Sequence, residues 1–183
     1  MGDRTCSTSG KDWEGIAYME TDGMGPAMSV TVISTPAATA VAERLRLACP
    51  PGVGAIALQG HESADEIRRR VGALPADALV VLALLPEEGR SVCDLAQVDL
   101  PAWRACMTIL PFTARVFQAL RLAQTGRLTV VCLGAQIALT GSSGMAMLSA
   151  VQEGQRSLVK AAARQWGEAR FHAHWVGLHP SEL

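Results

Sequence analysis

Short apolar runs alternate along this chain with longer segments whose apolar residues recur at helical spacing. The run at 78–84 is continuously apolar, which is typical of a parallel strand covered on both faces. Comparable patterns predict further strands at 29–34, 53–58, 127–133 and 170–177, and helices at 37–48, 63–74, 101–124 and 143–166. This alternation predicts an α/β fold with a doubly wound parallel sheet, of about six strands.

The first 27 residues follow neither pattern. They are rich in Gly, Ser, Thr and Asp and have no hydrophobic period, so we expect a flexible tail at 1–27 and a single domain at 28–183. Trp13, Ile16 and Tyr18 leave open the alternative that the tail is a docking segment. With 49% hydrophobic residues in 183, the chain can bury the core of one such domain.

Charge and hydropathy exclude several classes of partner. The 16 basic and 17 acidic residues nearly cancel, so no strong field attracts nucleic acid or an acidic membrane. No apolar run reaches the length of a membrane span, and the N-terminus lacks the apolar core of an export signal. We therefore expect a cytoplasmic protein that binds neither nucleic acid nor membrane.

Cysteine and histidine offer little chemistry. The five cysteines are widely spaced without a C-x-x-C pair, which indicates neither a disulfide framework nor a zinc site. Cys132, inside a predicted strand, is interpreted as a small buried hydrophobe rather than a nucleophile. His172 and His174 alternate onto one strand face and His179 follows, but no acidic or cysteine ligand accompanies them. We favour surface histidines and expect no metal, and the role of all three is left open.

Two segments carry a family resemblance. GRLTVVCLGA (126–135) reads as a buried strand entering a loop of small residues, and LSAVQEGQRSLVKAAARQWG (148–167) reads as a long helix. The end of that helix, with Ala163, Gln165, Trp166 and Gly167, resembles the A-x-E-W-G close of the short-chain dehydrogenase/reductase family. Over residues 28–180 the chain is similar to a ketoreductase-like member, which implies a Rossmann-like sheet and NAD(P)-dependent carbonyl reduction.

The catalytic positions of that family are filled here by residues that cannot do its chemistry. The tyrosine and lysine, four residues apart on one helix face, correspond to Leu148 and Gln152. A register shifted by three residues gives Met145 and Ser149 instead. The family's serine corresponds to Leu133, and its asparagine, seven residues after Trp103, to Leu110. The resemblance thus implies a fold without its catalytic groups.

The cofactor loop departs from the family in the same way. Thr35, Pro36, Ala37 and Ala38 stand where glycines let the backbone approach a dinucleotide diphosphate. Proline removes an amide donor and alanine adds a Cβ. We expect Thr35 and Thr39 to cap the following helix, and the aliphatic stretch at 77–90, which lacks the family's N-N-A-G, to form a more apolar, closed pocket. No cofactor is expected, with weak NAD(P) binding left open.

The resemblance also implies a partner. Family members pair two long helices with those of a second subunit, and continue past the sixth strand into a substrate-covering segment, whereas this sequence is expected to be truncated there. The corresponding helices, 101–124 and 143–166, carry apolar residues around much of their circumference: Ile109, Phe112, Val116, Phe117 and Leu120 on the first, and Met145, Met147, Leu148, Val151, Leu158 and Val159 on the second.

Three hypotheses follow from these observations. The first is a non-catalytic subunit that forms a homodimer, or a heteromer with an active ketoreductase-type relative, in fatty-acid or polyketide metabolism. The second is a divergent NAD(P)-dependent oxidoreductase with an altered cofactor loop, using another acid such as His172. The third is a small-ligand binding protein that keeps the cleft at the carboxyl ends of the strands.

Overall fold

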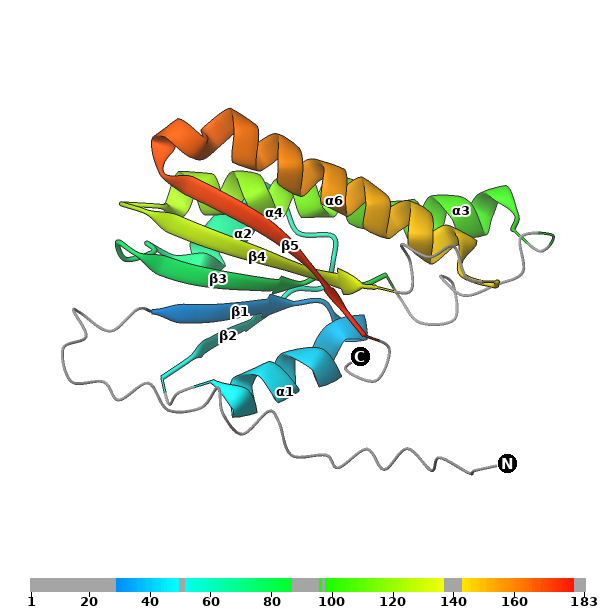
Figure 1. The fold of residues 1–183 in the computed structure, drawn as a ribbon, viewed down its shortest axis with the longest axis horizontal. Coiled ribbons are helices and arrows are strands. Elements are labelled where there is room, and N and C mark those ends of the chain that lie inside the picture. Colours follow the sequence, from blue (N-terminus) through cyan, green and yellow to red (C-terminus); the bar gives the residue numbers. More distant parts are fainter. Residues whose placement is uncertain (1–28, 50–51, 87–95, 97, 137–142, 180–183) are drawn as a thin grey trace, which may run out of the picture.

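The computed structural model describes residues 29–49, 52–86, 96, 98–136 and 143–179. Within them a five-stranded, wholly parallel sheet has the order β2-β1-β3-β4-β5. The strands are β1 (Val30–Ser34), β2 (Gly54–Ala57), β3 (Ala78–Ala83), β4 (Leu128–Ala135) and β5 (Phe171–Leu178). The α/β prediction is confirmed, with five described strands where about six were expected. After β2 the chain crosses to β3, on the other side of β1, so no described strand lies beyond β2 at that edge of the sheet (Figure 1).

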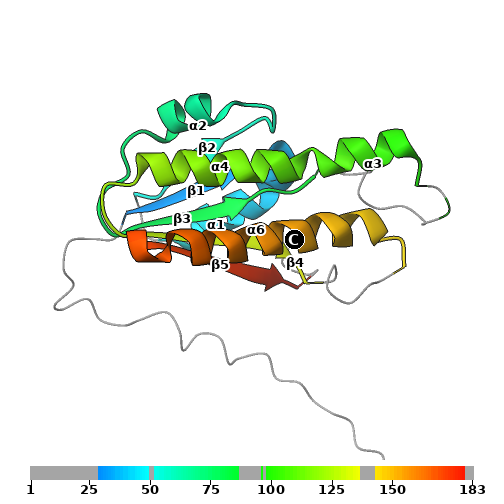
Figure 2. The same ribbon diagram turned by 90° about the horizontal axis from the view of Figure 1, so that it is seen from above.

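Helices cover the two faces of the sheet unequally. One face packs against α2 (Ala64–Val71), α4 (Ile109–Ala123) and α6 (Ala146–Trp166), which lie side by side in Figure 2. The other face packs against α1 (Thr39–Ala48), which follows a 3-10 turn, η2 (Pro36–Ala38). The remaining elements are α3 (Leu100–Met107) and a second 3-10 turn, η4 (Gly167–Ala169), between α6 and β5.

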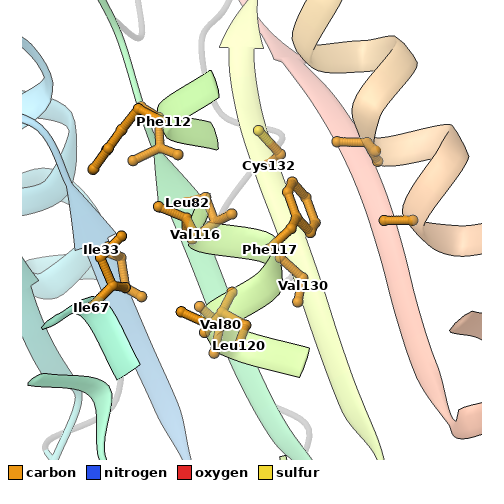
Figure 3. Close-up of a cluster of buried hydrophobic side chains, with 14 of the residues drawn as sticks. Ile33, Ile67, Val80, Leu82, Phe112, Val116, Phe117, Leu120, Val130 and Cys132 are labelled. Atoms are coloured by element: carbon orange, nitrogen blue, oxygen red, sulfur yellow. The ribbon is translucent and has the colours of Figure 1, made fainter. Parts of the chain in front are cut away.

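The main hydrophobic core lies between the sheet and the layer formed by α2, α4 and α6 (Figure 3). Phe112, Val116 and Leu120 of α4 are fully buried against side chains of β1, β3 and β4. Burying each such side chain contributes about 1.5 to 3 kcal/mol. Where α6 gives way to β5, the ring of Phe171 lies 5.2 Å from Trp166 and 6.1 Å from Phe117. These rings join α4, α6 and the edge of the sheet.

The helix expected at 101–124 is two helices in the structure. α3 ends at Met107 and α4 begins at Ile109, with Thr108 between them. Pro111 explains the break, because its nitrogen cannot donate to the carbonyl of Met107 and its ring would clash with that carbonyl. Elsewhere the predicted ends hold to within a few residues. Ser63 caps α2 by accepting a hydrogen bond from the Glu66 amide at 3.3 Å.

The apolar circumference of the two long helices, taken above as a sign of a partner, is largely covered within the single chain. All five apolar residues cited for the first helix are at most 6% exposed, and Met147, Val151 and Val159 of α6 are at most 2% exposed. Met145, Leu148 and Leu158 are half-buried. α4 lies between α2, α6 and the sheet, so a single chain already covers most of its circumference. No helix in the described part of the chain is long and apolar enough to cross a membrane.

Candidate functional site

The carboxyl ends of β1 and β3 define the place where a doubly wound sheet binds ligands. These two strands are neighbours, but the chain leaves β1 toward one side of the sheet and β3 toward the other, which opens a crevice between the following loops. A cleft of about 330 Å³ lies there, so the expectation of a closed pocket was wrong. It is lined by uncharged residues: Thr35, Pro36, Ala37, Gln59, Gly60, Leu85, Pro86, Ala105, Cys106, Thr108 and Ile109.

Thr35 closes the base of this crevice. Its side chain is 3% exposed, and its hydroxyl donates to the carbonyl of Leu85 at 2.9 Å and accepts from the Leu85 amide at 3.1 Å. The expectation that Thr35 and Thr39 cap the helix was wrong, because neither side chain makes a cap hydrogen bond and Thr39 donates to the Pro36 carbonyl instead. Thr35 directly follows β1, which places the backbone after β3 within reach of its hydroxyl.

The loop from Thr35 to Ala38 does not fit a dinucleotide diphosphate. Pro36 has no amide hydrogen, the Ala38 amide donates to the Thr35 carbonyl at 2.9 Å, and the Thr35 hydroxyl is occupied by Leu85. Ala38 is fully buried, so its Cβ occupies space inside the fold. Among the described lining residues, no cation faces the cleft to balance phosphate charge.

Glu62, beyond β2, is a buried acid that the sequence reasoning missed. Its carboxylate is 3% exposed and accepts backbone hydrogen bonds from Gln59, Gly60 and His61 at 2.7, 3.0 and 3.2 Å. Arg70 adds an ion pair at 3.2 Å and also donates to the Ala57 carbonyl. Burial acts to raise the pKa of Glu62, but the backbone hydrogen bonds outweigh it and hold the pKa below its ordinary value. The carboxylate is thus committed to its own loop.

Gln152 occupies the interior behind the strand ends, at the position that the resemblance assigns to the family's lysine. It is fully buried, and its Oε1 accepts from the Ala135 amide at 3.0 Å. Its Nε2 donates to Gln155 Oε1 at 3.1 Å. The side chain therefore ties α6 to the end of β4, and its two polar atoms both have partners.

Gln155 and Thr113 extend this into one buried polar network. Gln155 Nε2 donates to the Leu84 carbonyl at 2.8 Å and to Thr113 Oγ1 at 3.1 Å, and Thr113 Oγ1 donates to the Ile109 carbonyl at 2.8 Å. The network joins α4, α6 and the ends of β3 and β4. Sequence reasoning missed Gln155 and Thr113, although a second glutamine three residues after Gln152 shares its helix face and was an available signal.

Gly134 makes room for this network. A Cβ at this position would overlap Oε1 of Gln152 and the ring of Trp175. The small residue expected after the strand thus serves packing of the glutamine against β4.

The other three family positions are structural and dispersed. Leu133 is 6% exposed and packs with Ala38 and Val41 under α1, on the face of the sheet opposite α6. Leu110 packs against Gly154 of α6, and a Cβ added to Gly154 would lie 2.8 Å from the methyl carbons of Leu110. Leu148 is half-buried in the first turn of α6. In the alternative register, Met145 precedes α6 and the Ser149 hydroxyl is buried without a hydrogen-bond partner in the described structure.

Among the described residues, cysteine and histidine form no metal-holding cluster at this site, although the buried Cys106 lines the cleft. Cys132 is fully buried, and burial raises the pKa of its thiol to about 12, so it is protonated at neutral pH. His172 and His174 are exposed on the outermost strand, as predicted. Within the described ranges, no three His, Cys, Asp or Glu side chains are grouped to hold a metal.

Comparison with known proteins supports the fold assignment. No protein-family model and no curated protein matches the sequence. Among solved structures, a small-chain dehydrogenase in complex with NADPH is similar with a TM-score of 0.60 and 8% identity, over 82% of this chain and 70% of that one. Sorbitol-6-phosphate 2-dehydrogenase from Erwinia amylovora gives 0.59 and 11%, over 81% and 70%.

A third structure is a short-chain oxidoreductase from Pseudomonas aeruginosa PAO1 described as containing an atypical catalytic center. It gives a TM-score of 0.58 and 18% identity, over 81% of this chain and 69% of that one. Identities this low establish the architecture alone. The chain therefore has the fold of the short-chain dehydrogenases and reductases.

Proposed function

We propose that this chain is a non-catalytic subunit with a short-chain-reductase fold. The observation that carries the proposal is the buried Gln152–Gln155–Thr113 network, which uses the interior behind the strand ends for packing. A lysine there would have to place its charge among fully buried groups with no described carboxylate beside it, and that costs several kcal/mol. The two hydrogen bonds between the Thr35 hydroxyl and the Leu85 backbone support the same conclusion, as does the uncharged lining of the cleft, because neither leaves a group to bind a cofactor diphosphate.

An assay for carbonyl reduction tests this proposal. We expect no NADH or NADPH oxidation with β-ketoacyl thioesters or simple ketones above a buffer control. The triple variant Leu133→Ser, Leu148→Tyr, Gln152→Lys should remain inactive, because Thr35 to Ala38 still exclude the diphosphate and Leu133 lies across the sheet from α6. Turnover by the wild-type chain at typical enzymatic rates of about 1 s⁻¹ or more would overturn the proposal.

We further propose that the subunit assembles through α4 and α6, with itself or with a reductase of the same fold. Supporting this is a shallow groove of about 240 Å³ between these helices, whose lining carries no charge. Its residues are Ala114, Phe117, Gln118, Leu158, Ala161, Ala162, Gln165 and Trp166. Small residues at such a surface let a second pair of helices approach closely.

Ala161→Arg tests the assembly. Ala161 is exposed in this groove, so arginine there should abolish association without disturbing the core, whereas Phe117 and Val159 are buried and unsuitable for this purpose. Leu47→Arg is the matched control, because Leu47 is 72% exposed on α1. Light scattering should show a dimer for wild type and Leu47→Arg and a monomer for Ala161→Arg. A wild-type monomer that also fails to bind ketoreductase-type proteins would refute this part.

The cleft favours a second candidate, a binding protein for a small uncharged ligand. Its polar groups are amides and hydroxyls, and its described lining has no cation to recognise a phosphate. We would compare adenosine with ADP by calorimetry. This candidate is supported if ADP binds at least about tenfold more weakly than adenosine, a difference of about 1.4 kcal/mol. It is excluded if neither compound binds.

A further inference from the structure

The outer edge of β5 is open in the described structure. β5 pairs with β4 in parallel over eight residues and is the last strand of the sheet, so its other side has no partner among the described residues. His172, His174 and Val176 along it are exposed, with Val176 at 43%. A long open edge presents unpaired backbone groups and is a template for another strand.

A basic groove runs beside this edge. About 460 Å³ in volume, it lies between α6 and β5, with Arg156, Lys160 and Arg164 on the helix side and Ala173, His174 and Trp175 on the strand side. The three cations are four residues apart, so they share one helix face. Arg156 pairs with Glu153 at 2.6 Å and the Lys160 charge also acts on Glu153, whereas Arg164 forms no ion pair with any described residue. The edge therefore favours an acidic strand.

A second copy of β5 fits this edge poorly. Two-fold pairing of the edges would continue the sheet and place both α6 helices on the same face of it. Their Arg156, Lys160 and Arg164 stripes would then meet across the axis, and like charges in apposition are unfavourable.

Residues 12–22 of this chain, DWEGIAYMETD, have the composition that the edge requires. As an extended strand, this segment places Asp12, Glu14, Glu20 and Asp22 on one face, together with Ile16 and Tyr18, and it contains no Lys or Arg. Its other face carries Trp13, Ala17 and Met19. All four carboxylates can thus face α6 at once.

The segment can reach the edge. Val30 and Phe171 lie at the same end of the sheet, because β1, β3, β4 and β5 are parallel. From β1 to a position outside β5 is four strand spacings, about 19 Å, and residues 23–29 span up to about 23 Å when extended. Because residues 23–29 connect residue 22 to β1, the Asp22 end of the segment lies at the Phe171 end of the sheet. The segment therefore runs antiparallel to β5. Asp22 and Glu20 then arrive near Arg164, which lies toward that end because Trp166 contacts Phe171.

We propose that residues 12–22 add to the open edge of β5 of the same chain as an antiparallel strand, with their acidic face on the Arg156–Lys160–Arg164 stripe. The sheet thereby gains a protected sixth strand, and the Lys160 and Arg164 charges gain partners. Charge complementarity and the length of the connection both favour this segment over other occupants.

Amide hydrogen exchange of the full chain, resolved by residue, tests the proposal. Alternate amides within 14–21 should exchange at least about tenfold more slowly than those of residues 2–9. The variant Lys160→Glu, Arg164→Glu should remove this protection. Arg44→Glu, Arg69→Glu is the control, since both arginines are exposed on other helices and the net charge changes equally.

A variant in which the charges of the segment and of α6 are swapped is the decisive test. Combining Lys160→Glu, Arg164→Glu with Glu20→Lys, Asp22→Lys should restore at least half of the lost protection. The proposal is overturned if 14–21 exchange as fast as 2–9 in the wild type, or if the control removes protection as fully as the groove variant. Protection that appears only at concentrations where the chain dimerises would also overturn it, because the strand would then come from another molecule.

Discussion

At the scale of single residues, the chain's polar groups at the carboxyl end of the sheet serve one another. Gln152, Gln155 and Thr113 satisfy backbone groups of β3, β4 and α4, and Glu62 satisfies three consecutive amides of its own loop. A buried network of this kind stabilises a unique packing when every member is paired, and destabilises the fold when one is lost. That asymmetry makes its members good targets for substitution.

Gln152→Leu should lower the free energy of unfolding by about 2 to 4 kcal/mol, because it leaves the Ala135 amide and the Gln155 amide oxygen buried and unpaired. Urea denaturation measures the change. The matched control is Ser157→Leu on the same helix, where the side chain is exposed and the effect should stay within about 0.5 kcal/mol. Equal effects of the two variants would contradict a structural role for Gln152.

Glu62→Gln should destabilise the protein by about 1 to 3 kcal/mol at pH 7. The folded pKa of Glu62 is lower than its ordinary value of 4.5, so its stabilising contribution is present above pH 4.5 and is lost as the pH falls through the folded pKa. The difference between wild type and variant should therefore shrink below pH 4.5 in denaturation experiments. An exposed control, Glu168→Gln, should show no such difference, and a gap that widens in acid would contradict the account.

At the scale of elements, the period of hydrophobicity was sufficient to predict every described strand and the main helices. It did not show the break at Thr108, because that break follows from Pro111 and not from the spacing of apolar residues. It also could not show that α4 is enclosed by α2 and α6, because amphipathicity records how much of a helix is apolar and not which element covers it.

The contact between α4 and α6 depends on Gly154. A Cβ there would lie 2.8 Å from both methyl carbons of Leu110, so Gly154→Ala should destabilise the protein by about 1 to 3 kcal/mol despite its better helix propensity. Adding Leu110→Ala opens space for the new methyl group, and the double variant should be more stable than the sum of the single changes predicts. Strict additivity in urea denaturation would show that Leu110 does not pack on Gly154.

At the scale of the whole molecule, the candidate site divides into a part that sequence could predict and a part that it could not. The sequence alone showed which residues the resemblance places at the family's catalytic positions, Leu133, Leu148 and Gln152, and that no glycine stands between Thr35 and Ala38. The contacts that these positions make could not be predicted, because the hydrogen-bond partners are distant in sequence: Thr35 bonds a residue 50 positions away, and Gln155 one 71 positions away. Only the sheet order brings these residues together.

Our central proposal is that this chain uses the position of the fold's dinucleotide site for internal packing. Calorimetric titration of the wild-type chain with NADH and with NADPH tests it most directly. We predict dissociation constants weaker than about 1 mM, a binding free energy no more favourable than about −4 kcal/mol, because Pro36, the buried Ala38 and the occupied Thr35 hydroxyl leave no seat for the diphosphate. A dissociation constant of about 10 μM or tighter for either cofactor would contradict the account.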